Sequence, residues 1–400
     1  MALALGLVGC GVMGRRHVLG MKRLQTVGRL SFELAAVCDI LPESAARMAG
    51  EAEDWLGRRP AAYSDVDEML RGTALDAIII TTTPETHTAV ALRAFAAGLH
   101  VMVEKPITLT VADGVRLVEA ARAAGHKLAV AENYRRDPIN RLGQALVAAG
   151  AVGRPFLATQ VSCGNGEFVI MTPWRHRRDR GGIVVDMGVH YADILEYYLG
   201  PIETVVGMNA IVDSQRIDTQ GVSHAADAED LSVGVMRFRS GAIGNWLLNL
   251  AGRGEGVFTR TVYGTGGSLS VPGDRSGKSL GLFQRRAGAD VSVPQDELLR
   301  LAPDFALDPT TAALFGGDRL SAYELPWTDI DAGLLGIEQA DFVEAIADNR
   351  EPEVTGEQGL RSLAVIFGLL ESERLGRMVA LDDVLQQRGQ AGENRTEVSA

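Results

Sequence analysis

The chain has 400 residues and a formal net charge of −12, and 46% of its residues are hydrophobic. That length exceeds what one ordinary core organises, so the sequence predicts two domains. An acidic chain lacks the basic surface that a phosphate backbone requires, which excludes nucleic acid as the main partner.

The three cysteines, Cys10, Cys38 and Cys163, have none of the short spacings of a zinc or redox motif. Unpaired cysteines are typical of a reducing compartment. No apolar stretch of the sequence has the length of a membrane-spanning helix. We therefore expect a cytoplasmic protein that binds no metal and does not contact a membrane.

A glycine-rich turn follows the first predicted strand. That strand spans residues 3–8 and is nearly all apolar, which predicts a place inside a parallel sheet. Gly9, Gly11 and Gly14 follow in the pattern GxGxxG, before a predicted helix at 15–24. The first glycine makes a tight turn, the second lets backbone meet a pyrophosphate, and the third lets helix and strand pack closely. The phosphates then lie at the helix N-terminus, where N–H groups are free.

Asp39 ends the second predicted strand, residues 32–38. A carboxylate there accepts hydrogen bonds from the hydroxyls of the adenosine ribose and repels a 2′-phosphate. Ile40 follows it and offers no positive charge. The sequence thus favours a dinucleotide site over an ordinary glycine turn, and NAD over NADP as the cofactor.

Strands and helices keep alternating as far as residue 131. Further strands are predicted at 74–80, 100–103 and 127–131, and helices at 65–70, 86–97 and 111–124. This rhythm is typical of a doubly wound parallel sheet, in which ligands collect at the carboxyl ends of the strands. The residues expected to bind the cofactor there are Gly9, Gly11, Val12, Met13, Gly14, Asp39, Ile40, Thr82, Pro84, His87, Glu104 and Lys105.

The pattern changes after residue 131. A helix is predicted from 133 to about 149 and a strand at 155–162, and strand-like runs without intervening helices then occupy 204–212, 231–239, 242–251, 259–263 and 268–271. Such a meander indicates an antiparallel sheet. The expected fold is an α/β Rossmann domain at 1–131, followed by an α+β domain at 132–385 with an open, mostly antiparallel sheet.

The last third of the chain gives weaker signals. Residues 284–328 have little periodicity and are expected to form a long excursion. Residues 334–347 and 358–375 are predicted to be amphipathic helices. The polar tail, residues 386–400, is expected to be disordered.

The stretch 181–193, GGIVVDMGVHYAD, carries the candidate chemistry. Asp186 and His190 are four residues apart, and Asp193 lies three beyond the histidine. On a helix these offsets place all three on one face, where they form either a site or a core histidine satisfied by an acid. Glycines before and within the stretch let a substrate or another backbone approach closely.

Four features of the sequence resemble the Gfo/Idh/MocA oxidoreductases, the family of glucose–fructose oxidoreductase and the inositol dehydrogenases. They span nearly the whole chain. They are the glycine motif extended to His17, the triplet Glu104-Lys105-Pro106, the stretch from Gly181 to Asp193, and a C-terminal run from Asp341 through Gly356 to Ser372.

This resemblance implies roles for particular residues. The catalytic lysine would be Lys105, the acid/base histidine His190, and Asp186 would lie beside them as partner of one or the other. The bond from Lys105 to Pro106 would be cis. The outer face of the second sheet would form the interface of a homodimer or homotetramer.

Oxidation of a secondary hydroxyl of a sugar, sugar derivative or cyclitol fits these groups. NAD takes the hydride, a neutral histidine accepts the hydroxyl proton, and an ammonium favours negative charge developing on the oxygen. The residues expected to bind such a substrate are Asn133, Tyr134, Arg136, Trp174, Arg175 and Asp193. The basic loop at 177–180 either attracts an acidic substrate or is a solvated run.

Two alternatives share the same motifs. One is an NAD-dependent enzyme that cleaves a glycoside through transient oxidation of its sugar. The other is a sensor that binds a dinucleotide without catalysis. The sequence leaves open the sugar or cyclitol and the direction of the reaction.

Overall fold

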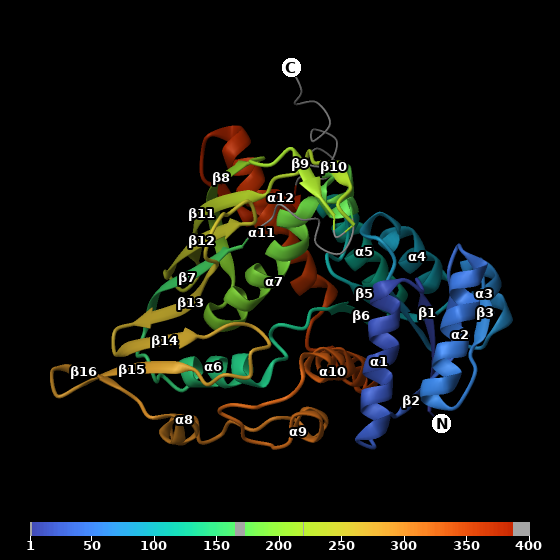
Figure 1. Cartoon of the computed structure of the whole chain (residues 1–400), viewed down its shortest axis with the longest axis horizontal. Helices are drawn as coiled ribbons and strands as arrows, with labels where there is room; N and C mark the ends of the chain where they lie inside the picture. Colours follow the sequence, from blue (N-terminus) through green and yellow to red (C-terminus); the bar gives the residue numbers. More distant parts are fainter. Residues whose placement is uncertain (1, 165–172, 219, 387–400) are drawn as a thin grey trace.

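A computed structural model of the chain describes residues 2–164, 173–218 and 220–386. Its two large sheets lie side by side, each with its own helices (Figure 1). The N-terminal sheet has six strands and the second sheet has nine. In the described ranges, no helix combines the length and the apolar character needed to cross a membrane.

The first sheet is fully parallel, with strand order β3-β2-β1-β4-β5-β6. Its strands are β1 (Leu3–Val8), β2 (Phe32–Cys38), β3 (Ala61–Tyr63), β4 (Ala77–Ile80), β5 (His100–Glu104) and β6 (Leu128–Ala131). Its helices are α1 (Val12–Thr26), α2 (Pro42–Leu56), α3 (Val66–Gly72), α4 (Pro84–Ala96) and α5 (Val111–Ala124). Every residue of β4 and β6 is buried, as expected for strands covered on both faces.

The second sheet has the order β16-β15-β14-β13-β7-β12-β11-β8-β17, and all its pairs are antiparallel except β7 with β12. Its strands are β7 (Pro155–Cys163), β8 (Ile202–Ala210), β11 (Leu231–Phe238), β12 (Ile243–Asn249), β13 (Val257–Gly264), β14 (Gly267–Val271), β15 (Gly281–Arg286), β16 (Ala289–Ser292) and β17 (Val379–Ala380). Strands β9 (Gln215–Ile217) and β10 (Ser223–Ala225) form a separate hairpin. The predicted fold class, a Rossmann domain followed by an open and mostly antiparallel sheet, is confirmed.

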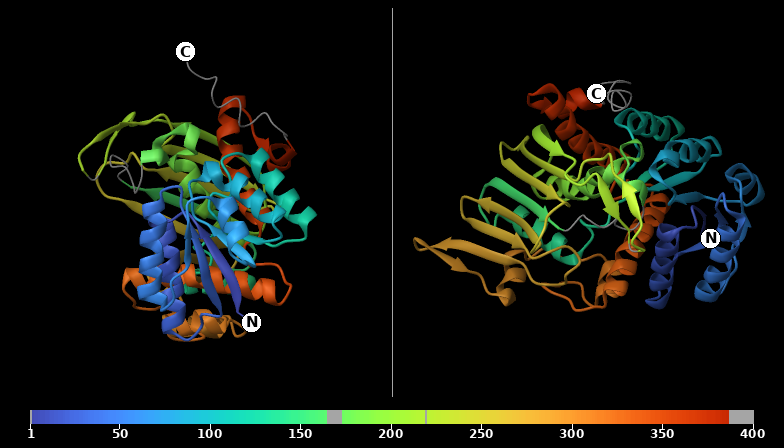
Figure 2. Two further views of the ribbon diagram at one scale, coloured as in Figure 1. Left: turned by 90° about the vertical axis from the view of Figure 1, so that its right-hand side faces the viewer. Right: turned by 45° about the horizontal axis from the view of Figure 1, so that its top comes forward.

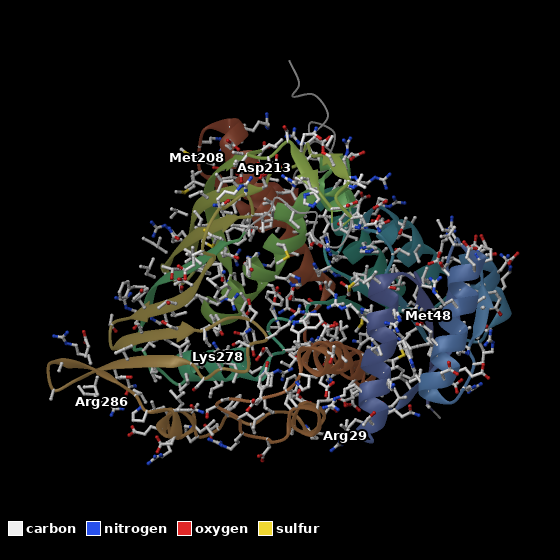
Figure 3. The ribbon with its side chains drawn as sticks, in the orientation of Figure 1. Arg29, Met48, Met208, Asp213, Lys278 and Arg286 are labelled. Atoms are coloured by element: carbon white, nitrogen blue, oxygen red, sulfur yellow. The ribbon has the colours of Figure 1, made fainter. Side chains whose placement is uncertain are left out.

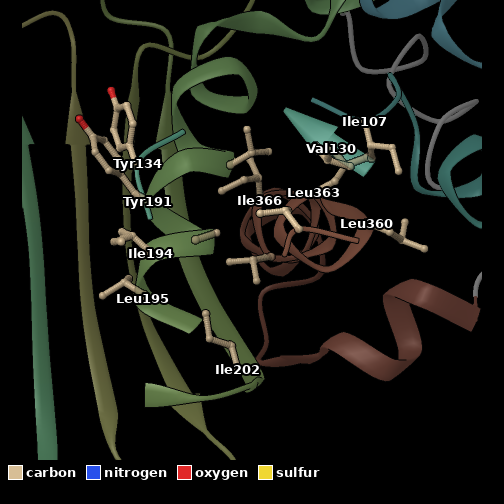
Figure 4. Close-up of a cluster of buried hydrophobic side chains, with 14 of the residues drawn as sticks. Ile107, Val130, Tyr134, Tyr191, Ile194, Leu195, Ile202, Leu360, Leu363 and Ile366 are labelled. Carbon is tan, nitrogen blue, oxygen red and sulfur yellow. The ribbon is translucent and has the colours of Figure 1, made fainter. Parts of the chain in front are cut away.

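Helices cover one face of the second sheet (Figure 2). Those that pack against it are α6 (Pro138–Ala148), α7 (Gly182–Leu199), α11 (Gly356–Leu375) and α12 (Leu381–Gln386). Helix α8 (Gln295–Leu301) packs on α6, whereas α9 (Pro309–Phe315) and α10 (Trp327–Ala347) pack on each other and on α1. Figure 4 shows how α7 and α11 share a core, in which Ile194 and Leu195 face the strands while Leu363 and Ile366 lie on α11. This core holds α7, and with it the candidate site, in a fixed position.

Helix α10 joins the second half of the chain to the first. It packs against α1 of the Rossmann domain, and a Cβ on Gly20 would lie 3.0 Å from the backbone nitrogen of Gly336. The two backbones therefore meet at glycines, where a side chain would hold them apart. Arg16 of α1 and Asp331 of α10 add an ion pair across the same contact.

Several elements differ from the predicted ones. Helix α2 and strand β3 were not expected. Apart from Met48, the buried positions of α2 are small residues such as Ala45, Ala49 and Ala52, so the sequence shows no run of large apolar side chains there. The stretch 284–328 is not an irregular excursion, because it contains the end of β15, all of β16, and helices α8 and α9. The predicted disorder of the tail concerns residues that, apart from Gln386, lie outside the described ranges.

Candidate active site

The glycine turn between β1 and α1 has the shape of a dinucleotide cradle. Gly9 has φ +100°, and a Cβ on Gly14 would lie 2.0 Å from the carbonyl oxygen of Gly9. Gly11 caps α1, and a Cβ there would meet nothing within 4 Å. Two glycines thus make the turn possible, and the third leaves open space above the N–H groups of the helix. This geometry fits a pyrophosphate.

Asp39 is held in place at the end of β2. Its Oδ2 accepts the backbone N–H of Cys10 at 2.7 Å, and its Oδ1 accepts that of Leu41 at 2.9 Å. Ile40 beside it is exposed. The carboxylate therefore lies next to the glycine turn, where a ribose would follow the pyrophosphate.

Other expected cofactor residues lie at the same edge of the sheet. Thr82 lies in the loop after β4, and Pro84 is the first residue of α4. Glu104 accepts from His17 at 2.9 Å. Burial acts to raise the pKa of Glu104, but His17, Lys105 and Arg16 together outweigh burial and lower it. His87 needs a correction. It is fully buried with its ring nitrogens near the carbonyl oxygens of Thr82 and Pro106, so it connects two loops instead of facing a ligand.

Lys105 reaches from the Rossmann domain to α7. Its Nζ donates to Oδ1 of Asp186 at 2.9 Å and to the carbonyl oxygen of the same residue at 3.1 Å. Arg175 approaches the other carboxylate oxygen of Asp186, with Nε 2.8 Å from Oδ2. Burial acts to raise the pKa of Asp186, but the two cations outweigh it and hold that pKa below its usual value. The bond from Lys105 to Pro106 is cis, as predicted.

The Gly-Gly pair starts α7. Gly181 and Gly182 have φ of +106° and +80°, a conformation that favours glycine, and the helix begins at Gly182, just before its reactive residues. A Cβ on Gly188 would lie 2.7 Å from Cδ1 of Ile366. Gly188 therefore lets α11 pack closely against α7, and of the two uses expected for these glycines, the structure shows close packing of another element at this position.

His190 is paired with Glu132, a residue that was not predicted. Its Nδ1 lies 2.7 Å from Oε1 and 2.8 Å from Oε2 of the glutamate. The ring of Tyr134 stacks on the imidazole, with centroids 4.1 Å apart. Burial and the positive charge of Lys105 lower the pKa of His190 well below its usual value, so the ring is neutral near pH 7. Of the two partners considered for Asp186, the structure selects Lys105.

The expected substrate residues fall into two groups. The first group lies around the site. Asn133 accepts a hydrogen bond from Arg275, and Tyr134 stacks on His190. Arg175 forms an ion pair with Asp186, and its guanidinium lies over the ring of Trp174. Arg136 is fully buried in ion pairs with Asp341 and Glu353, so its expected substrate contact is corrected to a structural role.

Asp193 has a buried partner of its own. Arg135 donates to both of its oxygens, at 2.7 and 2.5 Å. Burial raises the pKa of Asp193 to about 6, against the effect of Arg135. The substrate contact of Asp193 stays a prediction, whereas the ion pair explains its place on α7.

The basic loop is locally neutralised. Arg177 pairs with Asp227, Arg178 with Glu229, and Arg180 with Glu85. These partners come from other parts of the chain, and they explain the run of arginines without an acidic substrate. Within the described ranges, no group of three or more His, Cys, Asp or Glu side chains could hold a metal ion.

Sequence reasoning missed Glu132, Arg135 and Arg275. Glu132 directly follows the buried strand β6, which is the same signal that selected Asp39 and Lys105. Arg275 had no such signal. It lies after β14, far along the chain, yet its guanidinium donates to Asn133 at 2.9 Å and lies over the ring of Tyr134.

The fold and the site together define a class of protein. A Rossmann sheet with a dinucleotide cradle faces a second domain, and a lysine, an aspartate and a histidine meet between them, as in dinucleotide-dependent oxidoreductases. The sequence matches the oxidoreductase family with an NAD-binding Rossmann fold over residues 3–132, and the GFO/IDH/MocA C-terminal domain over residues 141–270. The chain belongs to the Gfo/Idh/MocA family of oxidoreductases.

Named relatives match along nearly the whole chain. D-apiose dehydrogenase of Paraburkholderia graminis is 27% identical over 94% of this chain and 88% of its own length. The 1,5-anhydro-D-fructose reductase of Ensifer adhaerens is 29% identical over 94% of this chain and 98% of its own. A crystal structure of an NAD binding oxidoreductase from Klebsiella pneumoniae has the same fold, with a TM-score of 0.80 and 24% identity over 95% of this chain and 99% of that one.

Proposed function

We propose that this protein transfers a hydride between a secondary hydroxyl of a sugar, sugar derivative or cyclitol and the nicotinamide of NAD. The observation that carries the proposal is the ion pair of Lys105 with Asp186, one helical turn from the buried imidazole of His190. Relatives named for action on D-apiose and on 1,5-anhydro-D-fructose support the substrate class.

Each of the three side chains has a distinct task in this proposal. An ammonium has three N–H donors, and Asp186 takes two of those of Lys105, which leaves one for the substrate oxygen. That contact favours negative charge on the oxygen as its proton leaves. The neutral ring of His190 accepts the proton. Bound NAD supplies the hydride acceptor.

Asp39 supports NAD over NADP in this proposal. Two backbone N–H donors fix its carboxylate in place. The carboxylate would therefore face a ribose hydroxyl or a 2′-phosphate without being able to turn away. The first contact is a charge-assisted hydrogen bond and the second a repulsion.

We also propose that the outer face of the second sheet joins copies of this chain into a homodimer or homotetramer. Strand register places exposed apolar side chains on that face: Val206, Met208, Val233, Val235, Ile243, Tyr263 and Phe283. Met208 of β8, labelled in Figure 3, is 76% exposed. Exposed apolar side chains that recur across neighbouring strands of one face are typical of an interface.

A substrate screen tests the proposed activity. The protein is incubated with a panel of sugars, sugar derivatives and cyclitols, and the absorbance of NADH is followed with NAD and with NADP in parallel. We expect NADH to form with at least one secondary alcohol and a slower reaction with NADP. Faster turnover with NADP would overturn the role given to Asp39.

Two other results would replace the proposal. Release of an aglycone from a glycoside without net NADH would identify a glycoside-cleaving enzyme. NAD binding without turnover across the panel would identify a sensor.

A further inference from the structure

The contact between Glu132 and His190 links the residue that directly follows the Rossmann sheet to helix α7, and the proposed function does not use it. Glu132 follows the last strand of the Rossmann sheet, and His190 lies in the middle of α7. Both are 3% exposed. With Nδ1 2.7 and 2.8 Å from the two carboxyl oxygens, a proton lies between the ring and the carboxyl group.

Tyr134 fixes both members of this pair. Its backbone N–H donates to Oε1 of Glu132 at 3.0 Å. Its ring stacks on the imidazole, with an angle of 6° between the two ring planes. The guanidinium of Arg275 lies over the same ring, 5.1 Å from its centre. The imidazole is therefore held in one orientation, with Nδ1 towards the glutamate and Nε2 as the nitrogen left to meet a substrate.

With the imidazole in this orientation, the number of protons on the pair determines whether Nε2 can accept one from a substrate. When the pair holds one proton in the contact and one on Nε2, the ring has no lone pair for a substrate hydroxyl. When the pair loses a proton, Nδ1–H donates to the carboxylate and Nε2 becomes an acceptor. Because Glu132 and His190 share one proton, the ionisation is a property of the pair and cannot be assigned to either residue alone.

We propose that Glu132 is a positioning residue that sets the tautomer of His190, and that ionisation of the pair as a unit makes Nε2 the base of the reaction. In alcohol oxidation the hydroxyl proton then goes to Nε2, the hydride leaves carbon with its electron pair for the nicotinamide, and the C=O bond forms.

The surroundings place this ionisation near neutral pH. Burial raises the pKa of Glu132 to about 7, against the opposing effect of the cations around it. The charged and titratable groups facing the pair are Lys105 and Glu104 at the end of β5, Arg135 after β6, Arg275 after β14, Asp186 and Asp193 on α7, and Glu338 on α10. Because the ionised pair is the active form, oxidation should accelerate as pH rises through about 7.

Nuclear magnetic resonance of ¹⁵N-histidine-labelled protein tests the tautomer directly. The resonance of His190 is assigned by its loss in His190→Gln. Between pH 5.5 and 8.5 we expect the ring to stay neutral and to change tautomer near pH 7, with Nε2 losing its hydrogen as Nδ1 takes the proton shared with Glu132. If Nε2 kept its proton to pH 8.5, or lacked it already at pH 5.5, the proposal would be wrong.

Kinetics of Glu132→Gln give a second, independent readout. The amide oxygen can replace Oε1, because the N–H of Tyr134 needs an acceptor there, and it then also accepts Nδ1–H. This fixes the basic tautomer. We expect kcat/KM of the wild-type protein to fall about tenfold per pH unit below the transition, whereas Glu132→Gln should show no transition between pH 6 and 8.

Glu338→Gln is the matched control. Glu338 is also a fully buried glutamate near the pair, and in the described residues its carboxyl oxygens have no hydrogen-bond partner, His190 included. Its substitution should leave the transition in place. An unchanged transition in Glu132→Gln, or its loss in the control as well, would overturn the role of Glu132.

The kinetic part rests on the proposed function, whereas the resonance experiment does not. If no alcohol is oxidised, the proposed function fails and the titration of His190 still decides whether Glu132 sets its tautomer.

Discussion

At the scale of single residues, Asp39 is expected to determine the choice of cofactor. Its carboxylate is fixed beside the glycine turn by the N–H groups of Cys10 and Leu41. In Asp39→Asn, we expect the preference for NAD over NADP to shrink about tenfold to a hundredfold, because one charge-assisted hydrogen bond and one repulsion are lost. Titration of each reduced cofactor by fluorescence measures the preference. An equal preference in both proteins would contradict the role of Asp39.

Glu338 is expected to make stability depend on pH. Burial raises its pKa well above the usual value of 4.5, so the folded protein keeps it neutral while the unfolded chain ionises it. The fold therefore loses stability as pH rises above the unfolded value, by up to about 1.4 kcal/mol per pH unit. Glu338→Gln removes this loss, so its thermal midpoint should exceed that of the wild type increasingly from pH 5 to pH 8.

A surface glutamate provides the comparison for that measurement. Glu357→Gln, on the exposed first turn of α11, should follow the wild-type pH dependence. If the midpoints of Glu338→Gln and the wild type differed by a constant amount at every pH, Glu338 would ionise alike in both states and the explanation would fail.

At the scale of elements, the crossing of α1 and α10 depends on two glycines. A Cβ on Gly20 would lie 3.0 Å from a backbone nitrogen of α10, and one on Gly336 would lie 3.2 Å from the carbonyl oxygen of Gly20. Backbone cannot move as a flexible side chain does, so Gly20→Ala or Gly336→Ala should lower stability by about 1–3 kcal/mol. Denaturation in urea measures the change.

Gly50→Ala on α2 separates this clash from the general effect of alanine in a helix. A Cβ there has only the end of Arg59 near it, at 3.6 Å. The substitution should raise stability by up to about 1 kcal/mol, because alanine favours helix more than glycine does. If all three substitutions stabilised the protein equally, a Cβ at Gly20 or Gly336 would not clash with the opposite helix, and the explanation would fail.

The sequence predicted the elements whose side chains repeat with a clear period. The parallel strands other than the three-residue β3 were expected, as were α4, α5 and α11, because long apolar runs or stripes mark them. Helix α10 was expected only from residue 334, although it starts at Trp327, because Asp329 and the buried Asp331 interrupt the apolar pattern of its first turns. The site could be predicted where a polar residue follows a buried strand. Arg275 could not, because only the folded chain brings it to Tyr134.

At the scale of the whole molecule, the open face of the second sheet is expected to hold subunits together. Met208 and Val233 are directly opposite each other on neighbouring strands of this face. Replacing both by glutamate would bury two like charges in an interface, so Met208→Glu/Val233→Glu should behave as a monomer in sedimentation experiments. Val222→Glu, exposed outside the sheet, should keep the wild-type assembly. A monomeric wild-type protein would contradict this proposal.

The central claim is that Lys105 and His190 act on the substrate oxygen in the chemical step. Single-turnover formation of NADH, followed by absorbance with an accepted alcohol, measures that step most directly in the wild type, Lys105→Met and His190→Asn. We expect each variant to bind NADH as the wild type does and to transfer hydride about a hundredfold to ten-thousandfold more slowly. Wild-type rates of hydride transfer in both variants would contradict the account.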